Sequence, residues 1–116
     1  MWVIGGSVGA TYHNDVWHST DGATWTQATA NAAWSARSGH SSVVYDNKMW
    51  VMGGYDGGSN NDVWYSSDGV NWTEATDPVN GAAWPVRTYH GSVVYENKIW
   101  VMGGAVRSND VWHTSN

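Results

Sequence analysis

The fold is decided by Met49-Trp50-Val51-Met52-Gly53-Gly54, because the chain contains this stretch three times. Its copies are Met1-Trp2-Val3-Ile4-Gly5-Gly6 and Ile99-Trp100-Val101-Met102-Gly103-Gly104, at offsets of 48 and then 50 residues. Self-similarity at this period is typical of architectures in which each repeat is one small unit of secondary structure. The chain of 116 residues therefore divides into a repeat at 1–48, a second at 49–98 and a partial third at 99–116.

Four short segments of each repeat have the composition of β-strands. They are rich in β-branched and aromatic residues, and turn residues bound them. The first strand of a unit is expected at 40–45 and 90–95, and the second at 1–4, 49–52 and 99–102. The third is expected at 15–19, 62–66 and 110–114, and the fourth at 24–29 and 71–76. Tight hairpins are expected at Asp46-Asn47 and Glu96-Asn97, because Asn tolerates a positive φ. The sequence thus predicts an all-β fold.

The predicted strands are apolar on both faces. Along 49–52, Trp50 and Met52 point one way while Met49 and Val51 point the other. A sheet that is apolar on both sides must be covered on both sides. Packing four-stranded antiparallel sheets face to face, as the blades of a β-propeller do, meets this requirement.

Three marks make the repeat more specific. A Gly-Gly pair closes the second strand, a Trp lies on the third, and an Arg-x-x-His motif leads into the first, as Arg37-Ser38-Gly39-His40 and Arg87-Thr88-Tyr89-His90. The chain resembles the kelch family over essentially its whole length. The tryptophan-rich form, with Ser19-Thr20-Asp21-Gly22-Ala23-Thr24-Trp25, is most similar to bacterial and galactose-oxidase-like kelch propellers. The copper chemistry of galactose oxidase is not implied, because it needs a cysteine and the chain has none.

The resemblance implies rings of roughly six to eight blades with four strands each. Ten strands are predicted here, which make about two and a half kelch-type blades. Two interpretations stay open: the chain is an incomplete part of a longer propeller, or several copies complete an oligomeric ring. In either case broad apolar faces are left uncovered, so self-association is expected.

The composition excludes several classes of partner. The net charge is −5, and five basic side chains spread along the sequence cannot form the basic patch of a nucleic-acid-binding protein. No apolar run approaches the roughly 20 residues that cross a bilayer. There is no nucleophile motif and no metal-ligand spacing, so neither a catalytic residue nor a metal or cofactor is expected.

The Arg-x-x-His motifs provide the first candidate ligand-binding residues: Arg37, His40, Arg87 and His90. In a propeller they would lie near the central channel, where cations suit an acidic ligand. Alternatively, the same side chains tie the preceding loop to the neighbouring backbone. Because the motif recurs in each repeat, we favour this structural interpretation.

Two tryptophans outside the predicted strands are further candidates. Trp34 and Trp84 lie in the loop before each Arg, and we expect them to be the indoles most available to a ligand. Loop residues that differ between repeats are Tyr12-His13, Tyr55-Asp56 and Arg107. The recurrent Asp15, Asp62 and Asp110 could hold calcium, but hydrogen bonding within turns is the simpler interpretation.

These observations favour a binding or scaffold module that presents blade loops to a protein or glycan partner. The alternative is a fragment of a kelch-propeller enzyme, such as a sialic-acid epimerase-like protein. We expect no enzymatic activity, and an extracellular or cell-surface location is slightly favoured.

Overall fold

The computed structural model describes residues 1–105 and 108–115, and this part of the chain contains ten strands in three antiparallel sheets. The first sheet has β1 (Trp2–Val8), β2 (Thr11–His18) and β3 (Thr26–Thr29). The second has β4 (Ser41–Tyr45), β5 (Lys48–Tyr55), β6 (Ser59–Ser66) and β7 (Thr73–Glu74). The third has β8 (Gly91–Tyr95), β9 (Lys98–Met102) and β10 (Val111–His113).

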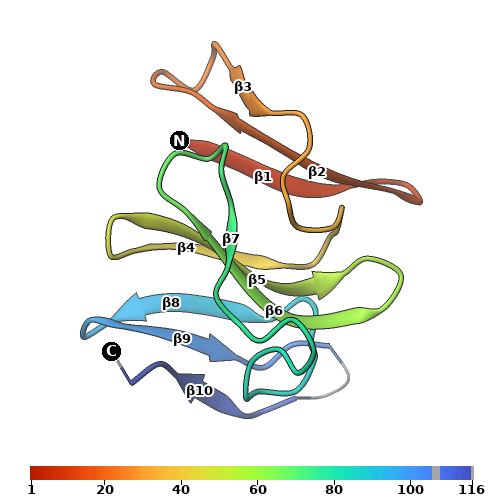
Figure 1. Cartoon of the computed structure of the whole chain (residues 1–116), viewed down its shortest axis with the longest axis vertical. Coiled ribbons are helices and arrows are strands. Elements are labelled where there is room, and N and C mark those ends of the chain that lie inside the picture. The colour runs from red at the N-terminus through yellow and green to blue at the C-terminus, as the bar shows by residue number, and fades with distance from the viewer. Residues whose placement is uncertain (106–107, 116) are drawn as a thin grey trace.

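The three sheets lie one after another along the longest axis of the molecule (Figure 1). In each sheet the strands follow one another in sequence order, so each sheet is a meander. The all-β prediction and the antiparallel blades are confirmed, with the second sheet being the complete four-stranded blade. Within the described residues no helix is long and apolar enough to cross a membrane.

The hairpins between the first two strands of a blade have the predicted geometry. Asp46 and Asn47 both adopt positive φ (51° and 57°), and Glu96 and Asn97 repeat this (49° and 58°). In both hairpins two residues join strands that pair directly, as Tyr45 does with Lys48. This two-residue turn matches the twist of the flanking strands, which explains why Asn recurs there.

The sequence had suggested that the Gly-Gly pairs close the second strand, but in the first two blades the strand continues beyond them. β1 continues to Val8 and β5 to Tyr55, with a register shift between Ile4 and Gly6 and another between Met52 and Gly54. Gly53 adopts φ 62°, and a Cβ there would lie 2.9 Å from the carbonyl oxygen of Arg87. The glycines therefore form a bulge that lets the next loop approach the strand closely.

The core lies between the sheets. One cluster of buried side chains joins the first and second sheets and includes Val16, Trp34, Met49, Val51 and Trp72. A second cluster joins the second and third sheets and includes Met52, Trp84, Ile99 and Val101. Apolar residues from both faces of β5 take part, so this strand is covered on both sides as predicted.

Candidate functional site

The Arg37 side chain is bound inside the second blade. Its guanidinium group donates to both carboxylate oxygens of Asp62, at 2.6 and 2.9 Å, and to the carbonyl oxygen of Gly53 at 2.9 Å. Further hydrogen bonds reach Ser35, and only 1% of the arginine is exposed. Arg37 thus ties the loop before β4 to β5 and β6 with a fork that matches a carboxylate in two places.

Arg87 repeats this arrangement in the third blade. It donates to both carboxylate oxygens of Asp110, at 2.9 and 2.7 Å, and to the carbonyl oxygen of Gly103 at 2.9 Å. The guanidinium group also lies 5.7 Å from the centre of the Trp84 ring. Recurrent contacts of the same kind support the structural interpretation of the motif.

Two of the three recurrent aspartates, Asp62 and Asp110, take part in these ion pairs, whereas Asp15 accepts a hydrogen bond from Trp17 Nε1 at 2.8 Å. Besides Arg37, Asp62 accepts a hydrogen bond from Trp64 Nε1 at 2.8 Å, and Asp110 accepts one from Trp112 Nε1 at 2.7 Å. Burial alone would raise the pKa of Asp62, but the hydrogen bonds from Arg37 and Trp64 outweigh it and hold the pKa below its usual value. The carboxylate is therefore ionised and paired with the arginine.

Hydrogen bonds from side chain to backbone, expected here for Asn and Asp, are made by the preceding asparagine. Asn61 Nδ2 donates to the carbonyl oxygens of Ala82 and Trp84, both at 3.2 Å. Asn14 makes the matching contacts with Ala32 and Trp34. In the first two Asn-Asp pairs the amide therefore fixes the following loop, and in all three pairs the carboxylate accepts a hydrogen bond from an indole.

The two histidines of the motif lie immediately before β4 and β8. His40 Nε2 donates to the carbonyl oxygen of Ile4 at 2.8 Å, and His90 Nε2 lies 2.7 Å from Ser41 Oγ. Burial lowers the pKa of both rings, that of His90 to about 4, with the charges of Arg87 and His40 lowering it further. Both imidazoles are therefore neutral at pH 7 and act as hydrogen-bonding links between blades.

Trp34 and Trp84 lie between the sheets, packed into the two core clusters. Trp34 is 0% exposed and meets Trp72 edge-on, with ring centres 5.8 Å apart. Its burial corrects the expectation that this ring faces a ligand. Trp84 is 8% exposed and belongs to the wall of a cavity between the second and third sheets.

Tyr12 of β2 and Tyr55 at the end of β5 contact each other, and Tyr89, in the loop before β8, is joined through its backbone to the Ser38-Gly39 segment that also bonds Tyr55. The rings of Tyr12 and Tyr55 are 5.9 Å apart. Tyr55 is hydrogen-bonded through its backbone to Ser38, and Tyr89 N donates to the carbonyl oxygen of Gly39. We call this set, Tyr12, Tyr55 and Tyr89, the tyrosine face.

Tyr89 was not predicted from the sequence. It occupies the position that Gly39 has in the preceding repeat, and both residues adopt positive φ (55° and 66°). An aromatic residue at positive φ is strained, yet its ring is 74% exposed. A tyrosine replacing a glycine between repeats was the available clue. Arg107, the other variable loop residue, lies outside the described residues.

The antiparallel sheets are stacked with apolar faces packed together (Figure 1), and the second and third blades each contain an arginine clasp, the Arg37–Asp62 or Arg87–Asp110 ion pair. These features define this chain as a stretch of β-propeller. The family model of the KLHDC2/KLHL20/DRC7 Kelch-repeats domain matches residues 1–115, so the chain belongs to the kelch-repeat family. No curated protein matches it. Membership of this family indicates a protein-binding or scaffold module.

Proposed function

We propose that the chain binds a protein partner through the tyrosine face. The observation that carries this proposal is the contrast between recurrent and variable residues. The recurrent Arg37 and Arg87 are buried and paired, whereas Tyr55 and Tyr89 are 38% and 74% exposed, on segments that both bond to Ser38-Gly39. Residues that the fold does not use internally are the ones available to a partner.

Tyrosine is well suited to such a role. Its ring supplies a large, stiff contact area at low entropic cost, and its hydroxyl can hydrogen-bond at the rim of an interface. Aromatic residues are enriched among the few positions that carry most of the binding energy. Asp56 beside Tyr55 accepts a 2.6 Å hydrogen bond from Ser35 Oγ, which fixes the loop before any partner arrives.

A protein partner is favoured over a glycan because the two tryptophans expected to stack on sugars are mostly buried in the core. Binding is favoured over catalysis because both motif arginines are already paired with carboxylates. The likeness to bacterial and galactose-oxidase-like propellers stays a prediction from the tryptophan-rich motif.

The test is affinity capture with the tyrosine face altered. Immobilised wild-type chain is compared with a Tyr55→Ala/Tyr89→Gly variant, and captured proteins are identified by mass spectrometry. The matched control is Tyr95→Ala, which removes a 62% exposed tyrosine at the opposite end of β8. We expect a partner that wild type and control retain and the double variant loses. A partner retained equally by all three chains would contradict the proposal.

A further inference from the structure

The two ends of the blades differ in charge. The hairpins between the first two strands of a blade lie at one end, and the turns between the second and third strands lie at the other (Figure 1). Lys48 and Lys98 follow the hairpins directly. At the opposite end, which carries the tyrosine face, Arg37 and Arg87 are buried in ion pairs. Within residues 1–105 and 108–115, this end therefore exposes carboxylates but no unpaired lysine or arginine.

Asp56 is the carboxylate closest in sequence to the tyrosine face, because it follows Tyr55 directly in the turn between β5 and β6. Its side chain is held in place by Ser35 Oγ, which donates to Oδ2 at 2.6 Å. Burial alone would raise the pKa of Asp56, but hydrogen bonds from the Ser35 and Asn60 side chains and the charge of Arg37 outweigh it and lower the pKa. The carboxylate is therefore ionised and fixed before a partner arrives.

The charge of Asp56 is not neutralised by the nearby arginine. Arg37 donates to Ser35 Oγ at 2.9 Å, but its guanidinium group is already paired with both carboxylate oxygens of Asp62. The arginine and the two aspartates together carry one surplus negative charge. A cation from a partner beside Asp56 would balance this charge.

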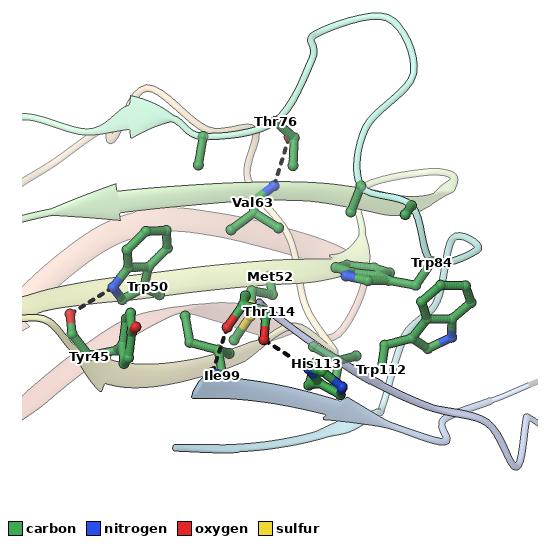
Figure 2. Close-up of a pocket in the computed structure, with 14 residues that line it drawn as sticks. Tyr45, Trp50, Met52, Val63, Thr76, Trp84, Ile99, Trp112, His113 and Thr114 are labelled. Atoms are coloured by element: carbon green, nitrogen blue, oxygen red, sulfur yellow. Dashed lines mark hydrogen bonds between the residues drawn. The ribbon is translucent and has the colours of Figure 1, made fainter. Parts of the chain in front are cut away.

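The third blade shows how this fold holds a cation between a ring and a carboxylate. The guanidinium group of Arg87 lies 5.7 Å from the centre of the Trp84 ring, which Figure 2 shows among the residues that line a cavity. The same group donates to both carboxylate oxygens of Asp110, at 2.9 and 2.7 Å. A guanidinium group is planar, so it can stack on an aromatic ring and also match a carboxylate in two places.

Tyr55 and Asp56 provide the same two groups on the surface. The Tyr55 ring meets the Tyr12 ring edge-on at 5.9 Å, and Tyr55 is 38% exposed. Consecutive Cα atoms are about 3.8 Å apart, which is shorter than an arginine side chain. One arginine can therefore reach both the ring of Tyr55 and the carboxylate of Asp56.

We propose that the protein partner of the tyrosine face is recognised through an arginine side chain, which stacks on Tyr55 and donates to the Asp56 carboxylate. This inference rests on the proposed function and adds the chemistry of the partner, an exposed segment with a positive charge. The net charge of −5 favours the approach of such a segment. Lysine fits less well, because its ammonium group is a point charge without the planar fork.

The test is a titration of the full chain with the peptide acetyl-Gly-Ser-Arg-Ser-Gly-amide, followed by NMR of the backbone amides. We expect saturable shifts at Tyr55 and Asp56, with a dissociation constant on the order of 1 mM. The same peptide with citrulline in place of arginine keeps the shape but not the charge. It should bind at least about tenfold more weakly, because hydrogen bonds between charged groups are the stronger ones.

A protein variant locates the site. Asp56→Asn keeps the size of the side chain and an oxygen that accepts from Ser35 Oγ, but it removes the charge, so the arginine peptide should bind at least about tenfold more weakly. The matched control is Asp46→Asn at the hairpin end, where the side chain is 72% exposed, and binding should not change. Equal binding of the arginine and citrulline peptides, or unchanged binding to Asp56→Asn, would overturn the proposal.

The capture experiment described above separates this inference from the proposed function. A partner that the Tyr55→Ala/Tyr89→Gly variant loses and the Asp56→Asn variant retains would keep the tyrosine face as an interface and overturn the role of arginine. Selective binding of the arginine peptide by a chain that captures no partner through the tyrosine face would contradict the proposed function instead.

Discussion

The two interfaces between neighbouring sheets are built from the same residues and differ by one indole. Between the first and second sheets, Trp72 closes the space above Trp34, and Trp34 is fully buried. Between the second and third sheets the space above Trp84 is a cavity, and Trp112 is 36% exposed where its equivalent Trp64 is partly buried in the core. Recurrent residues therefore shape an interface, but the last strand of the following blade closes it.

The largest effect is expected from Trp72→Ala, which would give the first interface the cavity of the second. Truncating a buried tryptophan costs about 3–5 kcal/mol through lost burial and the cavity left behind. Urea unfolding should show this loss. Trp25→Ala, at the half-buried equivalent position of the first blade, is the matched control and should cost clearly less. Equal losses for both variants would show that the Trp34–Trp72 contact is unimportant.

The Arg37–Asp62 ion pair should contribute more to stability than the Arg87–Asp110 ion pair. Arg37→Met leaves Asp62 unpaired with a side chain 21% exposed, and we expect a loss of about 3 kcal/mol. Arg87→Met leaves Asp110, whose side chain is 38% exposed, and water can replace the arginine in part, so a smaller loss than that of Arg37→Met is expected. Chemical unfolding of the two variants side by side measures the difference, and the reverse order would contradict it.

The pH dependence of stability reports on the histidine links. Burial holds the folded-state pKa of His90 at about 4, below the ordinary 6.5, so the native state favours the neutral ring. Its contribution is fully present above pH 6.5 and is lost as the pH falls towards 4, by about 2–3 kcal/mol. His90→Gln should flatten this slope in urea unfolding series between pH 7 and 4. An unchanged slope would mean that His90 is not the group responsible.

The smallest effect is expected at the strained tyrosine. Tyr89→Gly relieves a positive φ of 55°, but glycine also gains entropy in the unfolded chain, so a net stabilisation of about 0.5 kcal/mol is expected. Gly39→Ala at the matching position should instead destabilise, because its Cβ would clash with Thr88 Oγ1. Thermal unfolding of the two variants should move in opposite directions.

The strands and their order could be predicted because local patterns determine them. The repeated Trp-Val-Met-Gly-Gly stretch gave the second strand, and Asp46-Asn47 gave the two-residue hairpin, since backbone conformation there depends on adjacent residues alone. The bulge at the Gly-Gly pair was missed. It exists because the Arg87 backbone approaches Gly53, a contact between residues far apart in the sequence.

The site was harder to predict for the same reason. Arg37 and Asp62 are 25 positions apart, and only the folded blade brings them together. Trp34 looked like an accessible loop residue, because nothing local indicates that its loop folds between two sheets. The cavity beside Trp84 could not be recognised either, since its lining residues come from segments far apart in the sequence.

A double-mutant cycle on Arg37 and Asp62 tests the central claim most directly, namely that the recurrent motif residues hold the blades together and leave binding to the variable loops. Free energies of unfolding are measured for wild type, Arg37→Ala, Asp62→Ala and the double variant. Because the two side chains share two hydrogen bonds in a buried clasp, we predict a coupling energy of about 2–3 kcal/mol. Additive, small losses from the two single substitutions would contradict the account and make Arg37 available for a ligand.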